Sequence, residues 1–232
     1  MIGEAQDRIA HARALIFDLD GTLYDTKGFA RRLVLPRPWE GSLILAERMI
    51  RRDLSGCDYG TPEAYYGEFF SRMSQRVKKP AETLRTWYFD RYVPRMCGIL
   101  ERYYHPRPGT AELFASLAGR SFPFAVYSDY PLATERLSAL GMDRAYGKRY
   151  GPEHFGAQKP AVRPFLSIAA DLGVPPDRTL VVGDRNDTDG AGAAAAGMAY
   201  IGIVNRKKPG ESSGPLLCWE SFITLMGEFS GA

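Results

Sequence analysis

The sequence predicts an α/β protein with a Rossmann-like, three-layer α/β/α core and a parallel sheet, plus an inserted all-helical domain. After residue 106, short apolar segments alternate with segments of helical periodicity. This alternation is typical of a parallel sheet that helices cover on both faces. From about residue 27 to residue 105, by contrast, the periodic segments are helical and no strand candidate interrupts them.

The first predicted strand runs directly into two acidic residues. Four apolar residues, Ala14 to Phe17, precede Asp18, Asp20 and a glycine. Side chains two positions apart on a strand point the same way, so both carboxylates would emerge at the strand's carboxyl end, where open α/β sheets bind ligands. Two like charges at such a short distance are energetically costly unless a cation or a proton lies between them. A surface Asp-Gly turn explains this segment alone equally well.

The insert is predicted to be helical. Apolar and aromatic residues recur near helical spacing in three segments, namely residues 39–54, 61–77 and 80–93. Thr61, followed by Pro62 and Glu63, is a suitable N-cap and first turn for the second segment. Because roughly 80 residues suffice for a small domain, we expect a core domain of residues 1–25 and 106–232 and a separate helical domain of residues 26–105.

Beyond the Pro- and Gly-containing segment at 106–109, helices and strands are predicted to alternate. Gly141 and Gly173 are suitable helix ends. The predicted helices span residues 110–118, 132–140, 162–172 and 191–197, and the predicted strands span residues 122–128, 147–150, 178–183 and 199–204. The segment from Asn205 to Gly214 is polar and contains Gly and Ser, so we expect a loop there.

Composition is that of an ordinary globular chain. The 232 residues are 45% hydrophobic and 25% charged. The three cysteines lie far apart without C-x-x-C spacing, which indicates neither a disulfide framework nor a zinc site and fits a reducing compartment. The polar N-terminus lacks a signal peptide's apolar segment, and no apolar run approaches the roughly 20 residues that span a bilayer. We therefore expect a soluble, cytoplasmic protein with no membrane partner.

Charge is unevenly distributed along the chain. Residues 26–105 carry 15 Lys and Arg against 9 Asp and Glu, a net charge of +6 in a chain whose total is +3. A basic insert near an acidic site favours an anionic substrate, although a solvated helix face better explains any single arginine. Arg31, Arg32 and Arg37 lie nearest in sequence to the start of the insert. Because no nucleic-acid motif accompanies the basic helices, we expect no nucleic-acid partner. The oligomeric state stays open.

Two polar residues fall where a parallel sheet would bring them beside the first pair of carboxylates. Ser128 ends a predicted strand, and its hydroxyl could donate to a phosphoryl or carboxylate oxygen. Lys159 precedes Pro160 in a loop before a helix, and its ammonium could neutralise a carboxylate and a substrate anion together. Taken singly, a serine at a strand end is a turn former and a loop lysine is solvated.

A further group of carboxylates follows a later strand. Asp184 comes directly after the segment at 178–183, and Asp187 and Asp189 come soon after it. Acidic residues at the start of a helix are often capping residues. At this edge of the sheet, however, they would add to the two carboxylates already there.

These four segments, in this order, resemble the motifs of the haloacid dehalogenase superfamily. The matching residues are D-x-D-G-T-L at 18–23, a strand-ending Ser128, Lys-Pro at 159–160, and G-D-x-x-x-x-D at 183–189 followed by an Ala- and Gly-rich run. Each motif alone is weak, whereas the ordered set is specific. The resemblance implies a HAD-like core and a helical cap of the C1 class, because the insert lies between the first and second motifs.

The resemblance implies a phosphatase that works through an aspartyl-phosphate intermediate. Asp18 would be the nucleophile, and Asp20 would protonate the leaving oxygen and then activate water. Ser128 and Lys159 would bind the transferring phosphoryl group, and the backbone amides of Leu19 and Asp20 would add donors.

The resemblance also implies a Mg²⁺ cofactor. The carboxylates of Asp18 and Asp184 and the backbone carbonyl of Asp20 would be ligands, with Asp189 either a further ligand or the partner of a bound water. Dehalogenases of the superfamily carry no acid at the position of Asp20 and use no metal, so the acid argues against carbon–halogen cleavage. Asp129 departs from the Asn that is common there in the family.

The implied substrate is a small phosphorylated metabolite, such as a sugar phosphate, a phosphoglycolate-like acid or a nucleotide. A phosphomutase of the hexose-phosphate type is the alternative, because it shares every core residue and differs only in whether the aspartyl-phosphate meets water or a sugar hydroxyl. A non-catalytic binding protein on this fold is less favoured, since no catalytic position is missing.

Overall fold

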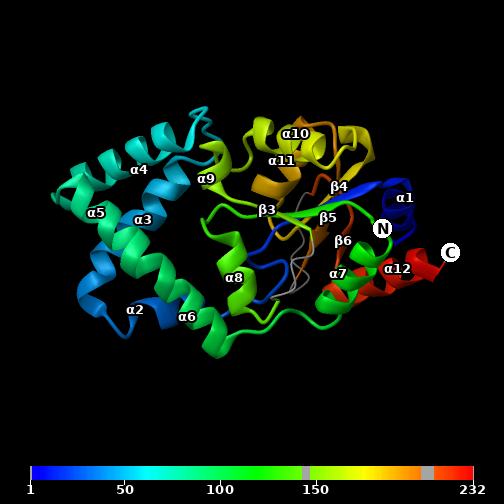
Figure 1. Ribbon diagram of the computed structural model, residues 1–232, viewed down its shortest axis with the longest axis horizontal. Coiled ribbons are helices and arrows are strands. Elements are labelled where there is room, and N and C mark those ends of the chain that lie inside the picture. The colour runs from blue at the N-terminus through cyan, green and yellow to red at the C-terminus, as the bar shows by residue number, and fades with distance from the viewer. Residues whose placement is uncertain (1, 143–146, 205–211, 232) are drawn as a thin grey trace.

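The structure is a computed structural model that describes residues 2–142, 147–204 and 212–231 (Figure 1). Its six strands form one parallel sheet in the order β3-β2-β1-β4-β5-β6. The strands are β1 (Ala14–Phe17), β2 (Phe124–Tyr127), β3 (Lys148–Tyr150), β4 (Thr179–Gly183), β5 (Ala199–Ile203) and β6 (Leu216–Leu217). The strand order reverses between β1 and β4, and such a switch point is where open α/β sheets place their ligand sites.

Helices cover both faces of this sheet, as the sequence predicts. Alternate residues of β1 divide between two hydrophobic clusters, with Leu15 and Phe17 in one and Ile16 in the other. The first cluster includes residues of α1, α7 and α12, and the second includes residues of α10 and α11. The helices outside the insert are α1 (Ile2–His11), α7 (Thr110–Gly119), α8 (Ala133–Ala139), α9 (Pro152–Phe155), α10 (Val162–Asp171), α11 (Ala191–Ala195) and α12 (Trp219–Gly231).

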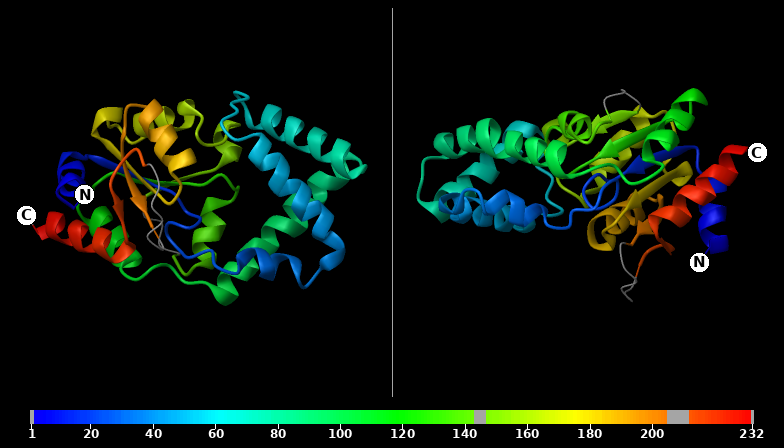
Figure 2. Two further views of the ribbon diagram at one scale, coloured as in Figure 1. Left: turned by 180° about the vertical axis from the view of Figure 1, so that it is seen from behind. Right: turned by 90° about the horizontal axis from the view of Figure 1, so that it is seen from below.

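The insert is helical and lies at the end of the molecule away from α1 and α12 (Figures 1 and 2). Its helices are α2 (Phe29–Val34), α3 (Gly41–Asp53), α4 (Pro62–Val77), α5 (Ala81–Trp87) and α6 (Val93–Tyr103). Thr61 caps α4 by accepting a hydrogen bond from the Ala64 amide at 3.3 Å. Aromatic side chains such as Tyr66, Phe69 and Tyr88 pack against one another in its core.

Several elements differ from the prediction. The helix expected at 80–93 continues to Tyr103, because a π-helical turn at Tyr88–Tyr92 joins α5 to α6. Helices α1 and α12 were not predicted, and only Ala5 and Ile9 of α1 are buried. Of the loop predicted at 205–214, residues 205–211 lie outside the described part, and residues 212–214 contain no helix or strand. No helix in the described part is long and apolar enough to cross a membrane.

The two connections between the insert and the sheet lie side by side. The Tyr24 and Tyr104 rings are 5.7 Å apart, and the Tyr104 hydroxyl donates to the Lys27 carbonyl at 3.0 Å. Arg107, beyond Tyr104, donates from Nε to the Thr22 carbonyl at 2.8 Å and from Nη2 to the Gly21 carbonyl at 2.9 Å. Both connections are therefore joined to the loop that follows β1.

Candidate active site

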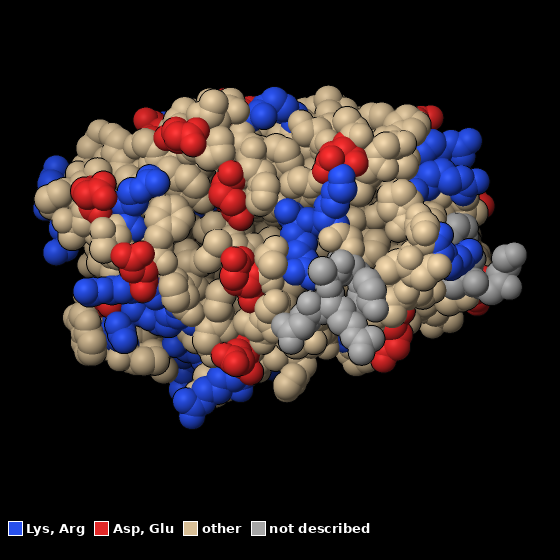
Figure 3. All heavy atoms as spheres, viewed as in Figure 1, with Lys and Arg blue, Asp and Glu red and all other residues tan. Residues whose placement is uncertain are grey.

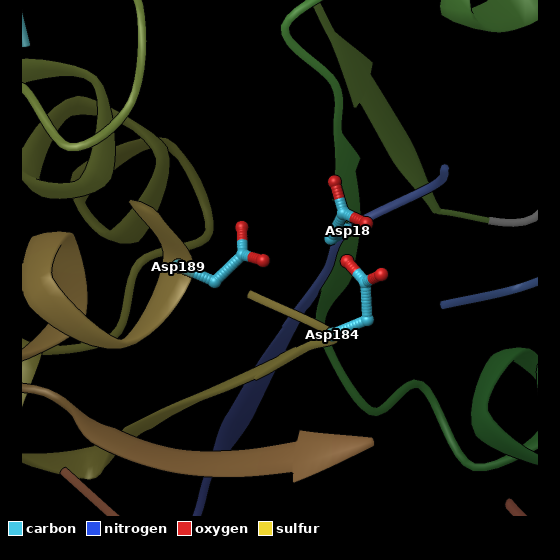
Figure 4. A group of neighbouring side chains, drawn as sticks. All are labelled: Asp18, Asp184 and Asp189. Atoms are coloured by element: carbon cyan, nitrogen blue, oxygen red, sulfur yellow. The ribbon is translucent and has the colours of Figure 1, made fainter. Parts of the chain in front are cut away.

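Three carboxylates predicted from the sequence meet at the carboxyl edge of the sheet. Asp18 follows β1, Asp184 follows β4, and Asp189 lies in a π-helical turn at Asn186–Gly190. One oxygen from each lies within 4.8 Å of the others, and the side chains point toward one another (Figure 4). The parallel pairing of β1 with β4 brings the first two together, since the carboxyl ends of neighbouring parallel strands coincide.

Two glycines of the motifs make this approach possible. Gly21 has a φ of +93°, and a Cβ built there would overlap the Asp184 carboxylate. A Cβ on Gly183 would overlap the Asp189 side chain. The glycines therefore give the carboxylates room to gather, and Gly21 also adopts a conformation that other residues rarely tolerate.

Lys159 lies inside the cluster, as predicted. Its Nζ donates to Asp18 Oδ1 at 2.6 Å and to Asp189 Oδ1 at 2.8 Å, and its side chain is only 3% exposed. On the other side, the Thr22 hydroxyl donates to Asp18 Oδ2 at 2.9 Å. One ammonium therefore contacts two of the three carboxyl groups, and the cluster contains more acidic groups than cations.

The electrostatics and the oxygen donors fit a divalent cation. Burial raises the pKa of Asp18 to about 7 although Lys159 opposes the shift, and burial together with the neighbouring Asp18 raises the pKa of Asp184 to about 8. The buried Asp184 Oδ1 has no hydrogen-bond partner in the described part of the chain. Carboxylate oxygens are the donors that Mg²⁺ prefers, and a cation here would relieve the repulsion that raises both pKa values.

These raised pKa values predict how stability depends on pH without a metal. Below about pH 4, Asp18 and Asp184 are protonated in both the folded and unfolded chains. As pH rises through 7 and 8, the unfolded chain has already ionised while the folded chain must ionise against burial and repulsion, so the free energy of unfolding falls.

The measurement is denaturant unfolding in excess chelator at pH 5 and pH 8, for the wild type and for Asp184→Asn. We expect the wild type to lose more stability than the variant between these pH values, and Mg²⁺ to restore stability mainly to the wild type at pH 8. Equal pH slopes in the two proteins would contradict the coupling.

Asp20 and Ser128 lie beside this cluster, but their side chains bind Arg136. Asp20 Oδ1 accepts hydrogen bonds from the Tyr24 hydroxyl at 2.5 Å and from the Arg136 guanidinium, and Oδ2 accepts one from the Ser128 hydroxyl at 3.0 Å. Burial alone would raise the pKa of Asp20, but Arg136 and the two hydroxyls outweigh it and lower that pKa. The carboxyl groups of Asp18 and Asp20 therefore sit in opposite electrostatic environments.

Sequence reasoning missed Arg136, although the sequence holds a signal for it. The side chain is fully buried on α8, where Ala133 and Leu137 are also buried. An arginine in the apolar stripe of a short helix is unusual, because a buried charge needs a partner. The acidic motif at 18–20 supplies that partner.

The site opens into a cleft of about 630 Å³ between the core and the insert. Helix α3 provides the insert's side of the cleft, including the exposed Arg48 and Arg52. Arg51 of the same helix donates from Nη1 to the Asp129 carbonyl at 2.6 Å, and Asp129 Oδ1 accepts a hydrogen bond from the Lys159 amide at 2.9 Å. The insert thus contacts the loop that follows β2.

Arg31, Arg32 and Arg37, the arginines nearest in sequence to the start of the insert, do not line this cleft. All three line a separate cavity of about 510 Å³ together with Arg95. Lys and Arg side chains gather there over α2 and α6, at the lower left of Figure 3. The arginines of the insert that face the cleft come from α3 instead.

The other predicted residues have mixed outcomes. Asp187 is exposed and pairs with Arg185 at 2.6 Å rather than joining the carboxylate cluster. Leu19 has a fully buried side chain, and the phosphate-binding role of its amide stays a prediction. The Asp20 carboxylate is not among the three clustered carboxylates, and the role of its backbone carbonyl as a metal ligand also stays a prediction.

Comparison with known proteins agrees with this geometry. Residues 12–197 match the family described as haloacid dehalogenase-like hydrolase. The chain is 30% identical over 195 residues to N-acetylmuramic acid 6-phosphate phosphatase of Pseudomonas aeruginosa, covering 81% of this chain and 82% of that protein. It is 26% identical over 205 residues to glyceraldehyde 3-phosphate phosphatase of Methanothermobacter thermautotrophicus, covering 83% and 85%.

The fold is also found among solved structures. The crystal structure of CbbY from Rhodobacter sphaeroides in complex with phosphate aligns with a TM-score of 0.64 at 20% identity, covering 92% of this chain and 96% of that chain. The shared arrangement confirms the expected α/β fold.

Proposed function

Because the chain belongs to the haloacid dehalogenase-like hydrolases, we propose that it is a Mg²⁺-dependent phosphatase that hydrolyses a small phosphate monoester through an aspartyl-phosphate. The observation that carries this proposal is the position of Asp18 at the switch point of the sheet, between Lys159 and two further carboxylates. The phosphatase names of the sequence relatives support the same reaction class.

The reaction begins with attack of an Asp18 oxygen on phosphorus. Asp20, which is ionised in the resting site because Arg136 and two hydroxyls lower its pKa, first takes up a proton from solvent. The P–O bond to the alcohol then breaks, and the leaving oxygen takes that proton from Asp20. A water molecule, deprotonated by Asp20, then breaks the aspartyl-phosphate to give inorganic phosphate and free Asp18. Lys159 and Ser128 bind the oxygens of the phosphoryl group and orient it for attack in line with the leaving oxygen.

Mg²⁺, held by Asp18, Asp184 and the Asp20 carbonyl with Asp189 nearby, would supply the positive charge that the phosphoryl transition state requires. Residues 26–105 act as a cap domain over a core of residues 1–25 and 106–232. Closure of the cap excludes bulk water during transfer, and reopening releases the products.

The experiment that tests this proposal is release of inorganic phosphate from a panel of small phosphate monoesters, with and without Mg²⁺. We expect Mg²⁺-dependent release from at least one sugar phosphate, short phospho-acid or nucleotide. Interconversion of isomers without net release would instead identify a phosphomutase. Binding of a phosphate ester with neither reaction would identify a non-catalytic protein.

The arginines of α3 predict how the substrate is gathered. Arg48 and Arg52 face the cleft, so the double substitution to Gln should lower kcat/KM at low ionic strength by about threefold to tenfold and flatten its salt dependence. The matched control replaces Arg31, Arg32 and Arg37, which line the other cavity, and should change neither quantity. A larger effect from the control set would contradict the assignment of α3 to the substrate side.

A further inference from the structure

The Asp20 side chain is held entirely by the core of the protein. Its Oδ1 accepts from Tyr24 and Arg136, and its Oδ2 accepts from Ser128. Acid–base catalysis requires a carboxylate oxygen within hydrogen-bond reach of the leaving oxygen. In the arrangement observed, both oxygens of Asp20 are already engaged by protein donors.

Arg136 is the residue that joins these contacts into one cluster. Its guanidinium binds Asp20 through Nη2 and donates to the Ser128 hydroxyl oxygen through Nη1 at 2.9 Å. The side chain is fully buried, so its orientation is fixed by packing as well as by these two contacts. The planar fork of a guanidinium suits such a paired role, whereas the single ammonium of a lysine does not.

The Ser128 hydroxyl has only one proton to donate. It donates that proton to Asp20 Oδ2 and accepts hydrogen bonds from Arg136 and from the Tyr130 amide at 3.1 Å. A phosphoryl oxygen that binds Ser128 must therefore accept a hydrogen bond from this same O–H group. Phosphoryl binding and the Ser128–Asp20 hydrogen bond exclude each other.

We propose that Arg136 is a positioning residue that keeps the Asp20 carboxylate and Ser128 together in the resting site, and that phosphoryl binding to Ser128 frees Asp20 Oδ2 to take up a proton from solvent, which Asp20 then donates to the leaving oxygen. This inference rests on the proposed phosphatase function. No covalent bond changes in the release itself, because the Ser128 hydroxyl only turns from one acceptor to another. Arg136 remains beside Asp20 and fixes where its carboxylate lies.

The same cluster is in contact with the insert. The Tyr130 ring lies 4.0 Å from the Arg51 guanidinium carbon and 5.3 Å from that of Arg136. Arg51 belongs to α3, which forms the insert's side of the cleft. Arg51 of α3 and Arg136 therefore contact the same aromatic ring, so the cluster that holds Asp20 adjoins the insert.

The test compares two leaving groups in wild type, Arg136→Met, Arg136→Lys and Asp20→Asn. The substrates are the best alkyl phosphate of the panel and p-nitrophenyl phosphate, and the quantity is kcat/KM, which reports the steps up to formation of the aspartyl-phosphate. An alkoxide needs protonation as it leaves and p-nitrophenolate does not. Loss of the acid should therefore lower kcat/KM mainly for the alkyl phosphate.

We expect Asp20→Asn to lower kcat/KM for the alkyl phosphate by about 100-fold or more and Arg136→Met by about tenfold or more, with losses for p-nitrophenyl phosphate within about threefold. Arg136→Lys should recover only part of the loss, because an ammonium cannot bind both partners as the guanidinium does. Arg8→Met, which removes a partly buried arginine bound to the Tyr200 carbonyl, is the control and should show no difference between the substrates.

A double-mutant cycle separates positioning from a merely structural role. If Arg136 acts through Asp20, the variant with both Asp20→Asn and Arg136→Met should be no slower on the alkyl phosphate than Asp20→Asn alone. It should also melt at a higher temperature than Arg136→Met, because the single variant leaves a partly buried carboxylate without its cation.

Each outcome decides the matter. Equal losses on both substrates, or additive losses in the double variant, overturn the role of Arg136 while leaving the phosphatase function intact. A wild-type protein that releases phosphate from neither substrate overturns both proposals. If Arg136→Met does not fold, the same two measurements are made on Arg136→Lys and on the double variant. Equal losses on both substrates, or additive losses, then overturn the role of Arg136.

Discussion

Replacing Asp18 with Asn should abolish turnover while preserving the fold. The substitution removes the proposed nucleophile but keeps the size of the side chain. Lys159 retains Asp189 as its partner at 2.8 Å. We expect kcat to fall by at least about 1,000-fold, equivalent to a barrier increase of about 4 kcal/mol.

Stability gives the control for this variant. Burial raises the pKa of Asp18, so the carboxylate opposes folding of the metal-free protein at neutral pH, and Asn should leave the melting temperature in chelator unchanged or higher. A second check is mass spectrometry of protein quenched during turnover, in which the phosphorylated wild-type species should be missing from the variant. Retention of a tenth of the wild-type kcat would refute the nucleophile assignment.

Replacing Asp184 with Asn should make the enzyme nearly inactive at Mg²⁺ concentrations that saturate the wild type. Asp184 contributes the buried Oδ1 that has no hydrogen-bond partner in the described structure, beside Asp18 and Asp189. Removing one anionic ligand of two or three weakens binding of a hard divalent cation. We expect the Mg²⁺ concentration for half-maximal activity to rise by about 100-fold or more.

The matched control is Asp177→Asn, which alters an exposed acid before the opposite end of β4 and should leave the Mg²⁺ requirement unchanged. Direct calorimetric titration of Mg²⁺ into the two variants separates weak metal binding from loss of the fold. Full activity of the wild type in excess chelator would reject the metal requirement altogether.

The fold was predictable because its core signals are local. Each inner strand is a short apolar run that ends at a polar residue, and such runs need both faces buried. Helix α1, in which only Ala5 and Ile9 are buried, was not predicted. The π-helical turn that joins α5 to α6 was missed because its hydrogen-bond shift leaves the helical spacing of apolar residues nearly intact.

The carboxylate cluster was predictable for a similar reason, since strand order places the residues that follow β1 and β4 at one edge. The contacts of Asp20, by contrast, could not be predicted from the sequence. They depend on where the buried face of α8 meets the loop after β1, and Arg136 reaches that loop only through tertiary packing. The orientation of the insert was likewise hidden, so proximity in sequence pointed to Arg31 where the structure places Arg48 in the cleft.

The paired connections of the insert limit its degrees of freedom. A body on one flexible tether can reorient about three axes, whereas two short segments fixed side by side, as at Tyr24 and Tyr104, favour rotation about the line that joins them. Arg107 fixes that line to the carbonyls of the loop that carries Asp18 and Asp20. Closure of the proposed cap would therefore cost little orientational entropy and would return α3 to the same register above Asp18.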